Sequence, residues 1–152
     1  MKAKQLFCKL GACSEAVKWV GDRTYAKAWR DCQRGDWLLW ITARMIGKRG
    51  WPTHQQVVLA ACACAETALK YAPAGETRPA EAIEIARKWT RGEATIGEVR
   101  TAAKAANAAY AAANYAACAA NAAYFARAES LASSADICRE MLEPKFAKEE
   151  GK

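Results

Sequence analysis

The run from residue 101 to residue 128 limits the possible folds of this chain more than any other feature, because 17 of its 28 residues are alanine. Alanine has the highest helix propensity, so the run predicts a helix. At about 100° per residue, alanines alone fill one half of that helix surface, and the larger side chains lie on the other half. An all-alanine face lets another helix backbone approach closely. The sequence therefore predicts an all-α protein built around one long helix.

Helix start and stop signals divide the rest of the chain. Glycines separate the first fifty residues into short helices, which we expect near residues 3–9, 14–20, 24–32 and 36–46. Thr53 and Gln56 form a capping-box pattern that opens a helix to about residue 72, and another helix is expected over about residues 77–90.

A second capping-box pattern, Thr95 with Glu98, opens the alanine-rich helix. We expect this helix to run to about Leu131, a length of about 54 Å at the usual rise per residue. Ser133-Ser134 is expected to interrupt it before a final helix at residues 136–142.

These elements predict one domain over residues 1–152, since no segment is long enough to act as a linker between two domains. The fold class is an all-α, single-domain helical bundle, in which short N-terminal helices pack around one long Ala-rich C-terminal helix. Its parts are a Trp-rich basic region, a helical pair, the long helix with the final helix, and a frayed tail, at residues 1–51, 53–90, 95–142 and 143–152.

Charge and tryptophan both concentrate in the first third. The formal net charge is +7; residues 1–51 hold 11 basic and 4 acidic side chains, whereas the remainder holds 12 of each. Such a basic surface attracts nucleic acid or an acidic protein, or only keeps an alanine-rich chain soluble. Five of the six tryptophans lie in the same third and are expected to form a core: Trp19, Trp29, Trp37, Trp40 and Trp51.

A stripe of asparagines follows the alanine-rich helix at intervals of seven residues. Asn107, Asn114 and Asn121 share one face, and Tyr110 and Tyr124 flank them. The stripe is either a solvated surface that keeps the helix soluble or a ridge that contacts a partner, because tyrosine is favoured at binding surfaces.

The patterns of catalytic, metal and membrane sites are not found. His54 is the only histidine, and no glycine-rich phosphate loop occurs. Seven cysteines without a preceding secretion signal predict reduced thiols in the cytoplasm. The uncharged segment 105–126 is long enough to cross a bilayer, but alanine inserts weakly and the asparagines oppose insertion. We therefore expect no enzyme activity, no cofactor, no metal and no membrane association.

Several strings resemble one family over about residues 6–139, the small Ala-rich helical immunity proteins of bacterial polymorphic toxin systems, which phages and prophages also encode. The most specific strings are Trp19-Val20-Gly21-Asp22-Arg23, Ala28-Trp29-Arg30-Asp31-Cys32, Arg34-Gly35-Asp36-Trp37-Leu38-Leu39-Trp40, Ala61-Cys62-Ala63-Cys64-Ala65, Gly92-Glu93-Ala94-Thr95 and Ala135-Asp136-Ile137-Cys138-Arg139. The resemblance implies a non-catalytic protein that neutralises an effector by binding it.

The leading hypothesis is a stoichiometric inhibitor of a protein effector, either an immunity protein or a phage counter-defence protein such as an anti-CRISPR. Since the chain is basic, its partner is expected to offer an acidic surface. The alternatives are a nucleic-acid-binding module that uses the basic third, and a structural protein that oligomerises through the stripe. The oligomeric state stays open. Candidate partner-binding residues are Asn107, Tyr110, Asn114, Asn121, Tyr124, Arg44, Lys48 and Arg49.

We predict that replacing Ala109, Ala113 or Ala116 by leucine costs about 1–3 kcal/mol, because a larger side chain would overpack a face that other helices cover. Thermal unfolding of the three variants measures the cost. Unchanged melting temperatures in all three would show that the alanine face is not packed.

Overall fold

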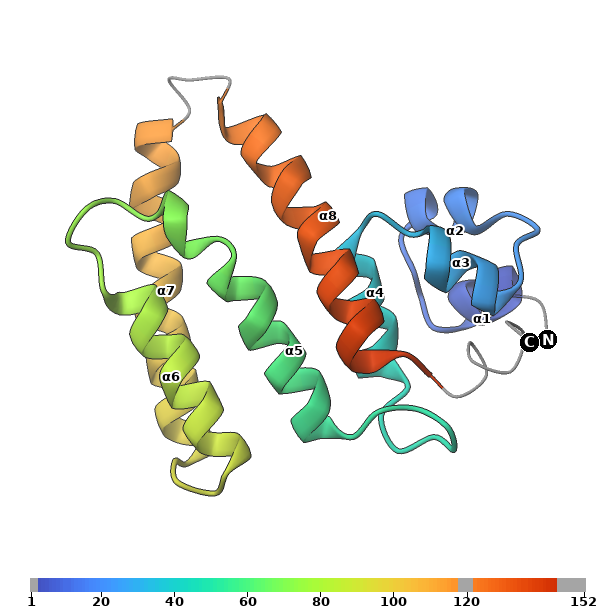
Figure 1. Ribbon diagram of the computed structural model, residues 1–152, viewed down its shortest axis with the longest axis horizontal. Helices are drawn as coiled ribbons and strands as arrows, with labels where there is room; N and C mark the ends of the chain where they lie inside the picture. The colour runs from blue at the N-terminus through green and yellow to red at the C-terminus, as the bar shows by residue number, and fades with distance from the viewer. Residues whose placement is uncertain (1–2, 118–121, 145–152) are drawn as a thin grey trace.

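The computed structural model describes the backbone of residues 3–117 and 122–144, and the side chains within those ranges except at 107–130. Every regular element in the described part is a helix, which confirms the all-α prediction (Figure 1). The elements are α1 (Ala3–Lys9), α2 (Ser14–Val20), α3 (Tyr25–Asp31), α4 (Gly35–Arg44), α5 (His54–Glu66), the short 3-10 helix η1 (Leu69–Tyr71), α6 (Arg78–Thr90), α7 (Ile96–Ala117) and α8 (Ala122–Leu142).

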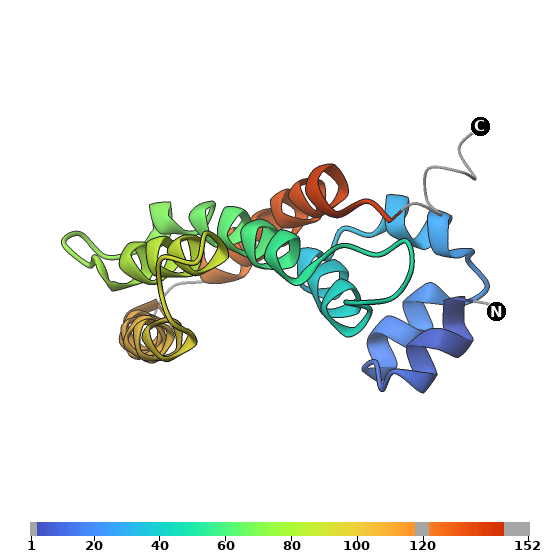
Figure 2. The same cartoon turned by 90° about the horizontal axis from the view of Figure 1, so that it is seen from below.

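The helices form a row rather than a bundle around one axis. α8 packs on both α4 and α5, α5 packs on α6, and α6 packs on α7. The three short helices α1, α2 and α3 lie together at the other end of the row, beside α4 (Figures 1 and 2). α4, α5 and α8 therefore form the middle of the molecule.

The expected single long helix is wrong. α7 has 22 residues and α8 has 21, and the two run in opposite directions (Figure 1). Alanine propensity favours the helical state at each residue but does not decide where a helix ends. A continuous helix of about 54 Å would extend far beyond α6, whose 13 residues span only about 20 Å. Two antiparallel helices each find a packing partner, so tertiary contacts decide the outcome.

The expected break at Ser133-Ser134 is also wrong, because α8 continues through both residues. Ser134 is buried at the contact with α4. A small residue is needed there for close packing, so the serine pair serves the helix contact and does not end the helix.

Both predicted capping boxes are confirmed. The backbone N–H of Thr53 donates to the Gln56 side chain at 2.8 Å, and the Gln56 N–H donates back to the Thr53 hydroxyl at 3.3 Å. Thr95 and Glu98 make the same reciprocal pair, at 2.7 and 3.2 Å. α5 ends at Glu66, earlier than expected, and η1 follows it.

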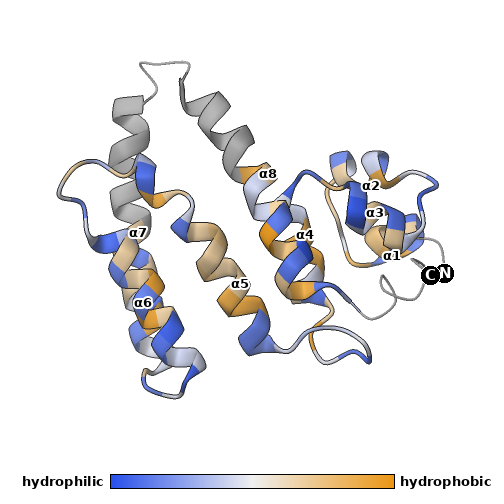
Figure 3. Cartoon of the chain, viewed as in Figure 1, coloured by the Kyte–Doolittle hydropathy of each residue, from blue (hydrophilic) through white to orange (hydrophobic). Residues whose placement is uncertain are grey.

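The hydrophobic core lies where α4, α5 and α8 meet the three short helices. Its buried members come from α1 to α5 and from α8, and α5 is hydrophobic along most of its length (Figure 3). Trp29 is only 4% exposed, while Trp19, Trp37, Trp40 and Trp51 are half-buried and pack against the cluster. The tryptophan-rich third thus contributes a large part of the core, as expected.

Helices α4 and α8 approach each other most closely at Gly35. A Cβ atom on Gly35 would lie 2.6 Å from the carbonyl carbon of Ser134 and 2.7 Å from the backbone nitrogen of Ala135. The Cys138 thiol donates to the Gly35 carbonyl at 3.8 Å, and the Arg139 guanidinium donates to the Cys32 carbonyl at 2.6 Å. Only glycine fits at this contact without moving one of the helices.

Side chains of residues 107–130 lie outside the described residues, so the leucine substitutions at the alanine face stay a prediction. At the described end of this face, Ala102, Ala105 and Ala106 are half-buried, while Lys104 is exposed.

We predict that Gly35→Ala destabilises the protein by about 1–3 kcal/mol, because its methyl group would push against the α8 backbone, which cannot move aside as a flexible side chain would. Urea unfolding measures the change in the free energy of unfolding. Gly97→Ala is the matched control: its methyl group would have Thr95 Oγ1 at 3.7 Å as its nearest neighbour. The control should be neutral or slightly stabilising. Equal effects in both variants would contradict the close contact.

Candidate interaction surface

The three basic candidates lie together at the end of α4. Arg44 is in its last turn, and Lys48 and Arg49 follow in the loop to α5; all three are exposed. Backbone hydrogen bonds from Lys48 to Met45 and from Trp51 to Lys48, at 3.0 and 3.1 Å, hold this loop in tight turns. We call Arg44, Lys48 and Arg49 the α4 basic patch.

The five Asn and Tyr candidates do not share one helix. Asn107, Tyr110 and Asn114 belong to α7, whereas Tyr124 belongs to α8. Their side chains lie outside the described residues, and Asn121 lies outside them altogether. The stripe expected along one continuous helix is therefore divided, and the reason is the same packing that separates α7 from α8.

A ladder of two tryptophans and two arginines crosses the surface between α2 and α4. The Arg23 guanidinium lies 4.7 Å from the centre of the Trp19 ring, and Arg34 lies 4.5 Å from that of Trp37. The two indole centroids are 5.8 Å apart and the planes are tilted by 60°. Cation–π contacts of this kind order the arginine side chains. We call these four residues the Arg–Trp ladder.

Both arginines of the ladder are already paired within the chain. Arg34 donates to both carboxylate oxygens of Asp36, at 2.9 and 2.8 Å, and lies 3.4 Å from Glu15. Arg23 donates to the Trp19 carbonyl and lies 3.9 Å from the Asp31 carboxylate. Burial favours the neutral form of Asp36, but the hydrogen bonds from Arg34 prevail and lower the pKa of this carboxyl. The ladder is therefore an internally satisfied structural element.

The α4 basic patch differs from the ladder because its charges are not neutralised. Arg44 lies over Trp40 at 5.5 Å, and Trp40 in turn packs near Phe7, with ring centroids 6.5 Å apart. Within the described residues, no carboxylate lies within 4 Å of Arg44, Lys48 or Arg49. Trp40 is the residue of this site that sequence analysis treated only as core. Trp40 lies four residues before Arg44 on the same helix, and this spacing could have indicated that the two side chains contact each other.

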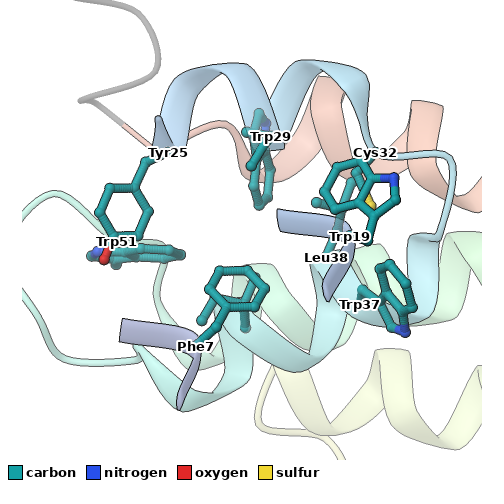
Figure 4. Close-up of a pocket in the computed structure, with 10 residues that line it drawn as sticks. Phe7, Trp19, Tyr25, Trp29, Cys32, Trp37, Leu38 and Trp51 are labelled. Carbon is teal, nitrogen blue, oxygen red and sulfur yellow. The ribbon is translucent and has the colours of Figure 1, made fainter. Parts of the chain in front are cut away.

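The aromatic residues of the first third enclose only a small cavity. Its volume is about 20 Å³, with Tyr25 and Trp51 at one end and Trp19 and Trp37 at the other (Figure 4). Such a space holds about one water molecule. The indole N–H of Trp29 is buried, and no hydrogen-bond acceptor reaches it within the described part of the chain. The cavity is a packing gap of the core and is too small to take a ligand.

The histidine and three buried cysteines are in unreactive positions, whereas a hydrogen bond with Cys138 lowers the pKa of the buried Cys64 thiol to about 7. The ring of His54 packs edge-on against Trp89, with centroids 5.1 Å apart. Burial raises the pKa of the Cys32 and Cys62 thiols, and a hydrogen bond with Cys64 together with burial raises that of Cys138. Among the described residues, no three His, Cys, Asp or Glu side chains are grouped so that they could hold a metal ion.

The described residues define a class: a helical protein with a tryptophan-rich core and, on its surface, a basic patch that no described carboxylate neutralises. The sequence matches the family described as "Imm-5 like putative immunity protein" over residues 51–137, more than half of the 152-residue chain. The chain belongs to this family. A comparison with curated proteins found no match, and neither did a comparison with solved structures.

The matched segment carries no net charge. Residues 51–137 contain eight basic and eight acidic side chains, and residues 138–152 contain four of each. The whole net charge of +7 therefore lies in residues 1–50, before the matched segment begins. No described helix is both long enough and apolar enough to cross a bilayer.

We predict that the Arg34–Asp36 pair stabilises the folded state at neutral pH and loses this effect in acid. Because the pKa of Asp36 is lowered on folding, the stabilisation is present above the ordinary carboxyl pKa of about 4 and disappears as the pH falls through the lower folded value. Asp36→Asn should thus reduce stability at pH 7 by up to about 1 kcal/mol, and less at lower pH. Urea unfolding from pH 7 to pH 3 measures the difference, with Asp22→Asn as control. A difference from wild type that does not change with pH would contradict the prediction.

Proposed function

We propose that this protein is a non-catalytic, stoichiometric inhibitor that binds a protein effector and neutralises it. The observation that carries the proposal is membership of the Imm-5 like family over residues 51–137. A family of immunity proteins suggests that the effector is a toxin. A phage-encoded protein that counters a host defence complex, such as an anti-CRISPR, is the second form of the same proposal.

The described side chains support binding rather than turnover. The thiols of Cys32, Cys62 and Cys138 are buried and held in the protonated form, so they are poor nucleophiles; the Cys64 thiol, whose pKa is lowered to about 7, is buried as well. The His54 ring packs against Trp89, and among the described residues no hydrogen bond joins it to a cysteine or serine that it could activate. An exposed basic patch next to a tryptophan is instead a surface typical of protein recognition. We propose that the protein acts in the cytoplasm, where its thiols stay reduced.

Nucleic-acid binding is the second candidate function, and one observation favours it: the whole excess of positive charge lies in residues 1–50. The indole rings of this region argue against base stacking. Trp19 and Trp37 each have a guanidinium over the ring and the other indole beside it. A nucleobase could stack on them only by displacing one of these groups. An acidic protein surface needs no such displacement.

The inhibitor proposal predicts that His54→Ala and Cys62→Ser leave neutralisation unchanged, since binding uses neither an imidazole base nor a thiolate. The effector is first identified by purification of the complex from the native host with mass spectrometry. Each variant is then titrated against the purified effector. Full inhibition should be reached at the same molar ratio of inhibitor to effector as with the wild-type protein. Loss of inhibition in a His54→Ala protein with a normal unfolding curve would point to an enzyme.

A further inference from the structure

The family-matched segment carries no net charge, and among its described residues seven of its sixteen charged side chains form ion pairs with one another. Arg87 pairs with Glu66 at 2.8 Å, between α6 and α5, and Arg91 pairs with Glu93 at 2.9 Å and with Glu84 at 3.6 Å. Arg78 is paired with Glu76. This half of the molecule therefore presents little field to a partner beyond the Debye length of about 8 Å at physiological ionic strength.

The first fifty residues show the opposite situation. Three of their four acidic side chains, Glu15, Asp31 and Asp36, are used by the two arginines of the Arg–Trp ladder. Eight exposed cations are left without a carboxylate within 4 Å in the described part of the chain: Lys4, Lys9, Lys18, Lys27, Arg30, Arg44, Lys48 and Arg49. The first fifty residues are therefore the source of a positive electrostatic field that attracts acidic groups.

The α4 basic patch is the place where these free cations are both concentrated and ordered. Arg44, Lys48 and Arg49 lie within six consecutive positions, and the turn hydrogen bonds fix the loop that carries two of them. The Arg44 guanidinium rests over Trp40, and Trp40 and Trp51 are half-buried beside the patch. Ordered arginine and tryptophan side chains lose little conformational entropy on binding, which is why they dominate protein interfaces.

We infer that the α4 basic patch, with the edge of Trp40, is the surface that engages the effector, and that the effector contributes an acidic protein surface. The inference rests on the proposed function and names the partner chemistry for it. Charge complementarity carries it, since the patch holds three unneutralised cations at one place, whereas the rest of the chain after residue 50 is neutral. A nucleobase could stack on Trp40 only by displacing the Arg44 guanidinium that lies over its ring, whereas an acidic protein surface needs no such displacement.

The test maps binding of a defined acidic probe by NMR. A peptide of about twenty residues, built of glutamate with two aromatic anchors, is titrated into ¹⁵N-labelled protein at low and at physiological salt. The six tryptophans give separate indole N–H signals. We expect the Trp40 indole and the amides of residues 44–51 to shift, and the Trp89 indole to stay in place. A single-stranded oligonucleotide of equal charge is titrated in parallel.

Two charge-matched triple variants locate the effect. Arg44→Gln, Lys48→Gln and Arg49→Gln together should weaken peptide binding by about tenfold, because three exposed ion pairs with the peptide are lost and each of them is weak. Lys88→Gln, Arg100→Gln and Lys104→Gln remove the same charge from exposed sites on α6 and α7 and should leave binding unchanged. Arg44→Lys keeps the charge but changes the guanidinium over Trp40, and should weaken binding about twofold.

Equal losses in the two triple variants, or shifts that avoid residues 44–51, would overturn the inference. Tighter binding of the oligonucleotide than of the peptide at physiological salt would also overturn it, in favour of nucleic acid. Failure of the proposed function gives a result that can be distinguished from failure of this inference. In that case the patch would bind the acidic peptide, but the protein would inhibit no effector. With the purified effector, the patch variant should associate more slowly, with a smaller salt dependence, and dissociate at a similar rate.

Discussion

The contact of Gly35 with the backbone of α8 is the constraint on which the rest of the structure depends. It joins the tryptophan-rich beginning of the chain to its last helix, because Gly35 opens α4 and Ser134 and Ala135 lie far along α8. The Arg139 guanidinium also donates a hydrogen bond to the Cys32 carbonyl at 2.6 Å, which joins α8 to the segment just before α4. Close backbone approach gives many small dispersion contacts at once, and a single added methyl group removes them.

This crossing also decides what α4 presents to solvent. With Gly35 and Leu38 buried toward the core, the helix turns Trp37 and Trp40 to positions where an arginine can cover each ring. At the beginning of α4, Arg34 is neutralised by Asp36, whereas at its end Arg44 has no carboxylate within 4 Å in the described part of the chain. One helix therefore carries a structural cation–π contact at one end and the proposed interaction site at the other.

Local sequence signals predicted the local structure well. The capping boxes at Thr53 and Thr95 and the glycine-separated short helices correspond to helices in the structure because their causes lie within four residues of each other. Cation–π pairs such as Trp40 with Arg44 were predictable for the same reason. The Trp19–Trp37 contact was not, since it depends on how α2 is placed against α4. Helix propensity likewise did not predict that the alanine-rich run forms two antiparallel helices, because it says nothing about the packing of α7 on α6 and of α8 on α4 and α5.

The separation of charge along the chain connects the fold to the proposed inhibition. The family-matched segment supplies helices with no net charge, and the first fifty residues supply the positive field that we propose attracts a partner. Long-range attraction accelerates encounter, while the final affinity depends on desolvated anchors at the contact. The α4 basic patch combines both elements, since Arg44 is charged, exposed and held against Trp40. A change of the exposed cations in residues 1–50 should therefore alter the choice of partner while the buried core and the contact of Gly35 with α8 stay intact.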